Sequence, residues 1–420
     1  MIFAHLDEKE FFMVPESKPY PLEEKYAASY VLPDPLKRED GTRIDTPAEW
    51  MNFQRRKILE LFKAVEYGEE LPRPDKLEFK ILSEKKDALG GLALRREIEI
   101  VCSMANGKSH SFIMLLYIPS DAAKKGKVPV FLGLNFKGNH ATTPEEDVLF
   151  TGRDPEGSFV CNERGVQRER WQHELLMERG YASATICYHD IYFDRMFSEG
   201  SSIFKLFFEP EQYDRIREKY SVIGAWAWGL SRAMDCLESV PEIDKDKVIL
   251  HGHSRLGKTA LWAGALDRRF AMVISNDSGC GGGCLHKRKI GENLSQHRFF
   301  ERREGNTACW FIDKTADFIF KEELLPIDQH ELLALIAPRP LAVGTATKDP
   351  YADPKGEFLA CKAASPVYEL FGSEGFRREE MLSPDECVYG DISFHYRTGV
   401  HDQTREDFLC YLHQADLFVK

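Results

Sequence analysis

Short, nearly continuous runs of apolar residues alternate with helical patterns through most of the chain. Eight such runs predict strands, at residues 97–104, 112–118, 128–135, 181–187, 247–251, 270–275, 341–345 and 391–396. Helical spacing of apolar residues marks six segments, at residues 167–178, 222–240, 258–267, 330–336, 356–368 and 404–418. Apolar runs this continuous are typical of parallel strands covered on both faces. The alternation therefore predicts a doubly wound, mostly parallel α/β sheet with helices on both sides.

Two parts of the chain depart from this alternation. Residues 1–45 are rich in proline and charge, which predicts an irregular arm, and apolar spacing predicts a helix over 50–67. Residues 279–328 have weak periodicity and many charges, which predicts an inserted lid between strands. We expect an N-terminal arm and helix over 1–90, packed on a single α/β domain over 91–420.

Composition and charge narrow the classes of function. The chain has 420 residues, 43% of them hydrophobic, and a net charge of −12. An acidic protein repels a phosphate backbone on average, so nucleic acid is not an expected partner. No stretch approaches the ~20 apolar residues that span a membrane. The N-terminal residues lack the features of an export signal, which predicts a cytoplasmic protein unless such a signal has been removed.

The ten cysteines are scattered, and several stand inside apolar runs. This distribution suits buried, reduced thiols in a cytosolic protein. Cys280 and Cys284 are close in sequence, but neither a second cysteine pair nor a histidine cluster completes a zinc site. We expect no metal and no cofactor.

One segment, HGHSRLGKTALWAG at 251–264, fits two different motifs. Its residues Gly252 to Thr259 match G-x-x-x-x-G-K-[ST], the phosphate-binding loop of nucleotide-hydrolysing proteins. The same residues also follow an apolar strand, as in the strand–serine–helix turn called the nucleophile elbow. The usual elbow is G-x-S-x-G, whereas here Leu256 stands at the second glycine position and Gly257 follows it.

Chain order favours the elbow, because α/β-hydrolases carry nucleophile, acid and histidine in that sequence. Ser254 follows the fifth predicted strand, and His401 follows the eighth. Asp349 and the less favoured Asp353 follow the seventh. In such a set the histidine removes the serine proton, and the carboxylate orients the histidine. The phosphate-loop alternative nominates Asp277 as a magnesium ligand and leaves the C-terminal quarter without a role.

Longer blocks around these residues resemble a known family. Gly252-His253-Ser254-Arg255-Leu256-Gly257-Lys258 is similar to the G-C-S-R-x-G-K signature of glucuronoyl esterases, carbohydrate esterase family fifteen. Residues 260–283, 325–341, 348–360 and 394–402 resemble its bacterial branch, and the likeness covers about 50–418. It implies an α/β-hydrolase with a lid. The implied activity is a serine esterase that cleaves 4-O-methyl-glucuronoyl esters of glucuronoxylan or its oligosaccharides.

The same resemblance implies the catalytic residues. Ser254 matches the nucleophile and His401 the general base. The acid matches either Asp349, which we favour, or Asp277, where the family commonly has glutamate. Arg255 matches an arginine beside the oxyanion, where a fixed cation stabilises charge that develops in the transition state.

Substrate contacts follow from the resemblance as well. Lys258 and Glu292 match residues that hold sugar hydroxyls, and Tyr351 falls where bacterial members usually have tryptophan. Trp310, in the predicted lid, is a candidate to line the pocket. His253 replaces a cysteine that forms a disulfide in fungal members.

The expected partner is a small-molecule or oligosaccharide ester, and the oligomeric state stays open. The main alternative is an acetyl xylan esterase that uses the same three catalytic residues. A phosphate-loop nucleotide-binding protein and a carbohydrate-binding protein with a decayed active site are more remote alternatives.

Overall fold

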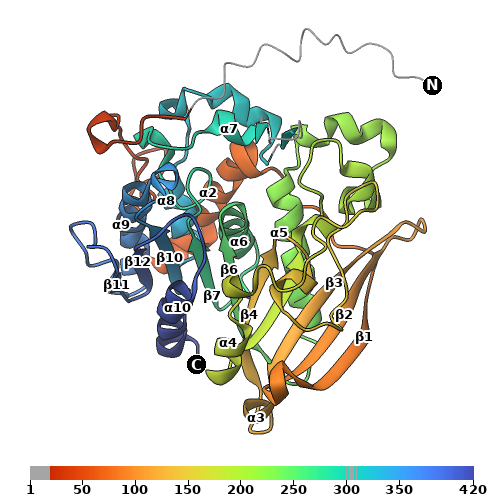
Figure 1. The fold of residues 1–420 in the computed structure, drawn as a ribbon. Helices are drawn as coiled ribbons and strands as arrows, with labels where there is room; N and C mark the ends of the chain where they lie inside the picture. The colour runs from red at the N-terminus through yellow and green to blue at the C-terminus, as the bar shows by residue number, and fades with distance from the viewer. Residues whose placement is uncertain (1–18, 299, 302–306, 309) are drawn as a thin grey trace.

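The computed structural model describes residues 19–298, 300–301, 307–308 and 310–420. Its centre is a ten-stranded sheet in the order β1-β2-β3-β5-β4-β6-β7-β10-β12-β11 (Figure 1). The strands are β1 (Lys76–Ala88), β2 (Ala93–Ser103), β3 (Ser109–Pro119), β4 (Val128–Asn135), β5 (Ala182–Cys187), β6 (Ile243–His253), β7 (Met272–Asn276), β10 (Leu341–Ala346), β11 (Glu386–Val388) and β12 (Ile392–Arg397). A separate two-stranded ribbon joins β8 (Phe300–Glu301) to β9 (Thr307–Ala308).

The middle of the sheet is parallel, as the apolar runs predicted. Strands β5, β4, β6, β7, β10 and β12 pair in parallel with one another, in that order. Every residue of β4, β5, β7 and β10 is buried, which explains why these strands read as continuous apolar runs. The antiparallel strands β1–β3 extend one side of the sheet, and β11 closes the other.

Different helices cover the two faces of the sheet. One face packs on α5 (Val222–Leu237), α6 (Arg255–Leu266), α8 (Gln329–Ala334) and α9 (Pro354–Leu370). The other packs on α4 (His173–Glu178) and α10 (Arg405–Phe418). Successive strand residues point to opposite faces, so Leu250 of β6 joins the first core and Ile249 joins the second. No helix in the described part of the chain is both long and apolar enough to cross a bilayer.

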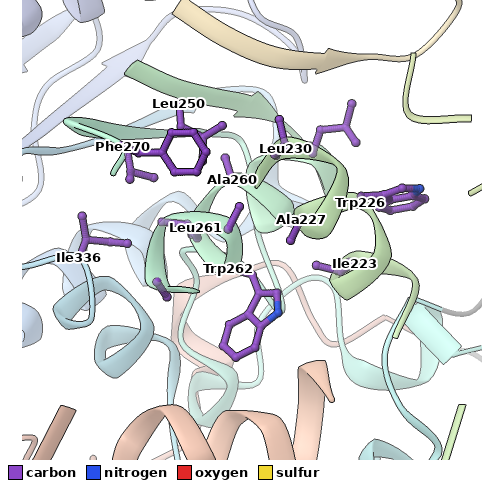
Figure 2. Packing of buried hydrophobic residues seen from close by; sticks show 14 of the residues in the cluster. Ile223, Trp226, Ala227, Leu230, Leu250, Ala260, Leu261, Trp262, Phe270 and Ile336 are labelled. Atoms are coloured by element: carbon purple, nitrogen blue, oxygen red, sulfur yellow. The ribbon is translucent and has the colours of Figure 1, made fainter. Parts of the chain in front are cut away.

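The helix expected near residues 50–67 is present and packs on α6. It runs from α1 (Pro47–Glu49) through α2 (Arg55–Phe62), with π-helical turns at Trp50–Gln54 and Lys63–Tyr67. The Tyr67 ring stacks on Trp262 of α6 with centroids 4.4 Å apart. Figure 2 shows Trp262 projecting from α6, beside the core formed with Ile223, Ala227 and Leu230 of α5.

Two segments differ from the sequence-based expectation, and a third, the predicted lid, has little regular structure. β1 lies within the 1–90 segment assigned to the arm, and its largely exposed edge position leaves no clear apolar pattern to detect. The helix expected from residue 167 begins only at His173, because Gln172 adopts a left-handed conformation with φ 44°. The described residues of the lid over 279–328 form short helical turns, including α7 (Leu294–Arg298), besides the β8–β9 ribbon.

Replacing Trp262 with alanine is expected to lower the free energy of unfolding by about 3–5 kcal/mol, because the side chain is 1% exposed and leaves a cavity between α6 and the N-terminal helix. Urea denaturation of the purified protein measures this loss. Trp262→Phe keeps a ring against Tyr67 and serves as the control, with a smaller loss. A loss below about 1 kcal/mol in Trp262→Ala would show that the helix docks independently of this residue.

Candidate active site

Ser254 occupies a strained turn between β6 and α6. Its backbone has φ 58° and ψ −131°, a region that residues with side chains rarely adopt and that is concentrated at functional sites. Gly252 permits the turn, since a Cβ there would lie 2.0 Å from the Leu256 carbonyl oxygen. Gly257 lets the helix approach the turn after β7, since a Cβ at this position would lie only 3.0 Å from Ser278 Cβ. The glycine one position later than usual therefore still provides close helix packing.

The turn excludes a phosphate-binding loop. Gly252 and His253 belong to β6, and Arg255 already opens α6, so only Ser254 connects strand and helix. A loop that wraps a phosphate needs the residues between its two glycines to be free of regular structure. What this turn offers instead is a serine above the positive end of a helix, whose first N–H groups have no partner within the helix.

His401 and Asp349 meet beside this turn. Asp349 Oδ2 lies 2.5 Å from His401 Nδ1. The His401 ring centroid is 4.5 Å from that of His253, the residue before the serine. Burial lowers the pKa of His253 well below its usual value, so its ring stays neutral next to His401. The aspartate side chain is 7% exposed and the histidine 43%, which places a buried acid behind an accessible imidazole.

Hydrogen bonds to backbone carbonyl groups hold the two loops that bear these residues. Arg397 Nη2 donates to the carbonyl oxygens of Val400 and Asp402, at 3.0 and 2.9 Å. The Lys348 N–H donates to the Gly399 carbonyl oxygen at 2.8 Å. These bonds restrain the chain on both sides of His401 and connect it to the loop of Asp349.

Asp277 follows β7 and lies close to the same pair, in a different environment. Its side chain is buried and neither carboxylate oxygen has a hydrogen-bond partner among the described residues. Burial raises its pKa well above the usual value, and the charges of Glu357 and Asp349 add to the effect. The nearest cation, Arg397 Nη2, is 3.8 Å away. Asp277 is thus disfavoured as an anion, whereas Asp349 bonds His401 directly.

Asp353, the third acidic candidate, caps a helix and binds an arginine. Its side chain accepts from the Gly356 N–H at the start of α9 and pairs with Arg288, Nε to Oδ2 at 2.8 Å. A carboxylate engaged by a helix N-terminus and a buried guanidinium is committed to those partners. Asp353 therefore anchors α9 and does not join the His401 pair.

Arg255 is aligned by an acid that sequence reasoning missed. Its Nη1 lies 2.5 Å from Asp194 Oδ2, and the guanidinium carbon lies 4.7 Å from the centre of the Trp310 ring. Asp194 also accepts from Trp310 Nε1 at 2.8 Å and from Tyr188 Oη at 2.9 Å. Asp194 is 1% exposed at its side chain and stands in a loop without a recognisable motif. These donors come from separate segments, so only the fold identifies it.

The predicted substrate residues form a second polar group beside the arginine. Lys258 Nζ donates to the Ser278 carbonyl oxygen at 2.5 Å and lies 3.5 Å from Glu292 Oε2. The Glu292 N–H donates to the Tyr351 carbonyl oxygen at 2.9 Å, which places Tyr351 next to it. Exposure rises outward, from a buried Lys258 through a partly exposed Glu292 to an exposed Tyr351. Trp310 is buried under both cations, 5.7 Å from Lys258 Nζ.

Glu357 of α9 holds the turn that follows Asp277. Its Oε1 accepts from the N–H groups of Ser278 and Gly279, at 3.0 and 2.9 Å. Complete burial raises its pKa to about 8, although these hydrogen bonds act in the opposite direction. The turn that supplies the carbonyl partner of Lys258 therefore depends on a carboxyl group that retains its proton far above the usual range.

Several known proteins with similar sequences and folds are esterases. A family model described as glucuronyl esterase, fungi, matches residues 182–372. Carbohydrate esterase MZ0003, from an unknown prokaryotic organism, is 39% identical over 94% of this chain and 91% of its own length. The 4-O-methyl-glucuronoyl methylesterase of Schizophyllum commune is 28% identical over 81% of this chain and 74% of its own. A glucuronoyl esterase structure from Solibacter usitatus has TM-score 0.85 and 36% identity, covering 94% of this chain and 99% of its own.

Glu357→Gln is expected to change how stability depends on pH. The folded-state pKa of about 8 exceeds the ordinary 4.5, so the folded protein binds a proton that the unfolded chain releases. The stability from this proton is complete below about pH 4.5 and is lost as the pH rises toward 8. Glutamine keeps an acceptor oxygen without titrating. Between pH 5 and 8 the variant should gain stability relative to the parent, on the order of a few kcal/mol.

Urea unfolding of both proteins across this pH range measures the difference. Titrating groups remote from Glu357 are common to the two proteins and cancel in the comparison. Parallel curves of unfolding free energy against pH would mean that Glu357 is ionised in the folded protein throughout.

Proposed function

This chain belongs to the glucuronoyl esterase family, and from that membership we propose that it hydrolyses esters of 4-O-methyl-glucuronic acid through an acyl-enzyme on Ser254. The single observation that carries the proposal is the Asp349–His401 hydrogen bond beside the strained serine. In that arrangement a buried carboxylate orients an imidazole whose other nitrogen is available to the substrate side. Its partner is a small-molecule or oligosaccharide ester.

The first half-reaction transfers the acyl group to the serine. With Nδ1–H donated to Asp349, His401 presents Nε2 as the acceptor for the Ser254 hydroxyl proton. The serine oxygen attacks the ester carbonyl, and the carbonyl oxygen becomes an oxyanion. Collapse of this intermediate breaks the bond to the alcohol, which leaves with the proton held by His401. Water then repeats the sequence on the acyl-enzyme and releases the uronic acid.

Two groups support the oxyanion at this position. The first N–H groups of α6 point beyond the helix start, where Ser254 stands. Arg255 adds a positive charge that Asp194 holds in one orientation. Donors fixed before the reaction stabilise charge that appears only in the transition state, which lowers the barrier without strengthening ground-state binding.

Asp349 is proposed as the acid of the catalytic set, with Asp277 in a supporting position. Asp349 is the carboxylate in direct contact with the imidazole. Asp277 is held away from ionisation by burial and by its acidic neighbours, so it is poorly suited to stabilise an imidazolium. This assignment gives each of the two aspartates a different role within one site.

Lys258, Glu292 and Tyr351 are proposed to bind the sugar ring of the acyl group. The Lys258–Glu292 pair presents donors and acceptors suited to ring hydroxyls, and the exposed Tyr351 ring suits stacking on a sugar face. An acetyl group has no hydroxyls to use these contacts. The same site is therefore expected to prefer glucuronoyl over acetyl esters, measured as a ratio of kcat/KM values.

Substitutions in the catalytic set are expected to rank in a defined order on benzyl glucuronate. Ser254→Ala should abolish measurable turnover, because no nucleophile remains. Asp349→Asn should lower kcat by about 10⁴, because the amide favours the wrong histidine tautomer. Asp277→Asn should cost less than about tenfold, because a group already disfavoured as an anion loses little charge.

Circular dichroism and thermal unfolding of each variant check that folding is retained. A larger kcat loss in Asp277→Asn than in Asp349→Asn would transfer the acid role to Asp277. Turnover that survives Ser254→Ala would contradict the acyl-enzyme. A higher kcat/KM on acetylated xylo-oligosaccharide than on benzyl glucuronate would favour the acetyl xylan esterase instead.

Asp194→Asn is expected to reduce kcat by about 10–100-fold with little change in KM. The amide keeps the size of the side chain but removes the charge that aligns Arg255, so the cost falls on the transition state. Steady-state kinetics on benzyl glucuronate separate the two constants.

Asp190→Asn is the matched control. Asp190 is a partly buried acid of the same region whose carboxylate accepts from the Gly152 N–H at 2.9 Å, whereas Arg255 pairs with Asp194. Its kcat should stay within about threefold of the parent. If Asp194→Asn instead raises KM and leaves kcat unchanged, Arg255 contributes to ground-state binding and not to oxyanion stabilisation.

A further inference from the structure

Two cysteines beside the outermost strand β11 are in direct contact. Cys387 stands in the edge strand β11, and Cys410 stands in α10. Their Sγ atoms are 2.6 Å apart, closer than the ~3.5–4.0 Å at which heavy atoms in nonbonded contact rest. The sequence predicted scattered, reduced thiols, but here tertiary packing brings together two residues that are 23 positions apart.

We propose that Cys387 and Cys410 form an intrachain disulfide bond in an oxidising environment. The bond would close a ring that contains β12, His401 and the first half of α10. It would thus covalently restrain the chain segment that carries the proposed general base. The inference concerns a modification of the chain and does not depend on the proposed reaction.

The surroundings favour reaction at these two sulfurs. Both side chains are only partly buried, so an oxidant has access to them. The contact with Cys410 lowers the pKa of Cys387 to about 6, with a smaller contribution from the nearby His395. A thiolate at neutral pH is the species that attacks a disulfide.

Other close cysteines in the described chain have different partners. Cys280 Sγ faces His286 Nδ1 at 3.4 Å, whereas Cys284 Sγ faces Asp353 Oδ2 at 3.6 Å. Both are buried. Their sulfurs are therefore engaged separately, although the residues are close in sequence. A metal site at the Cys387–Cys410 pair is also not supported, because the potential three-ligand group found among the described residues lies elsewhere, at Asp277, Asp349 and His401.

Oxidised glutathione is a suitable oxidant for the reaction. The Cys387 thiolate attacks its disulfide, forms a mixed disulfide and releases one glutathione thiol. Cys410 then gives up its proton and attacks Cys387 Sγ, which releases the second glutathione. One protein disulfide forms, one glutathione disulfide is reduced to two thiols, and the two protons from the protein thiols remain with the products.

The test uses the full chain, incubated either with oxidised glutathione or with a reductant, then alkylated, digested and analysed by mass spectrometry. Oxidised samples should contain a peptide pair joined through Cys387 and Cys410, two hydrogen masses below the sum of its parts. Cys161, a partly buried cysteine whose Sγ donates to the Glu163 carbonyl oxygen, should be alkylated in both samples. Full alkylation of Cys387 and Cys410 after oxidation, or glutathione adducts alone, would overturn the proposal.

Thermal unfolding supplies a second readout. The oxidised protein should have a Tm about 2–5 °C above the reduced protein, because the crosslink restricts the unfolded chain. Cys387→Ser and Cys410→Ser should each remove this difference, and Cys161→Ser should keep it. A redox-dependent Tm shift of the same size in Cys387→Ser would assign the effect to other thiols and contradict the proposal.

Discussion

Parallel pairing of β6, β7, β10 and β12 is the constraint on which the candidate site depends. Neighbouring parallel strands end at the same edge of the sheet, so the residues that follow them meet there. This brings together Ser254, Asp277, Asp349 and His401 from four separate strand ends. The strand residues nearest the site are almost all buried, and a shift in register would displace the residue at the strand end from the others.

The strained serine is a local consequence of the same arrangement. β6 must turn into α6 within one residue, and the helix must approach both its own strand and the turn after β7. Gly252 and Gly257 remove the two Cβ atoms that would prevent this approach. The packing of α6 on the N-terminal helix and on α5 supplies the buried area that holds the strained conformation in place.

Burial of charge organises the surroundings of the serine. Arg255 is paired with Asp194, and Lys258 with a backbone carbonyl and Glu292. Asp277 has its nearest cation, Arg397 Nη2, at 3.8 Å. The pKa values of Asp277 and Glu357 rise because burial makes the carboxylate anion costly. The site therefore combines fixed positive groups near the serine with acids that are disfavoured as anions. That combination suits a reaction in which negative charge develops on a carbonyl oxygen.

The sequence by itself determined the α/β class, the central strands, the elbow at Ser254 and the order of serine, aspartate and histidine. These features depend on local periodicity and on the order of residues along the chain, and both can be read from the sequence. Tertiary structure alone decided that Asp349 and not Asp277 bonds His401, that Asp194 aligns Arg255, and that Cys387 touches Cys410. β1 also escaped detection, because an exposed edge strand needs little apolar patterning. The hydrogen bonds and the sulfur contact share one physical reason. Each depends on a distance of a few ångströms between segments remote in sequence, and the local sequence pattern does not indicate that distance.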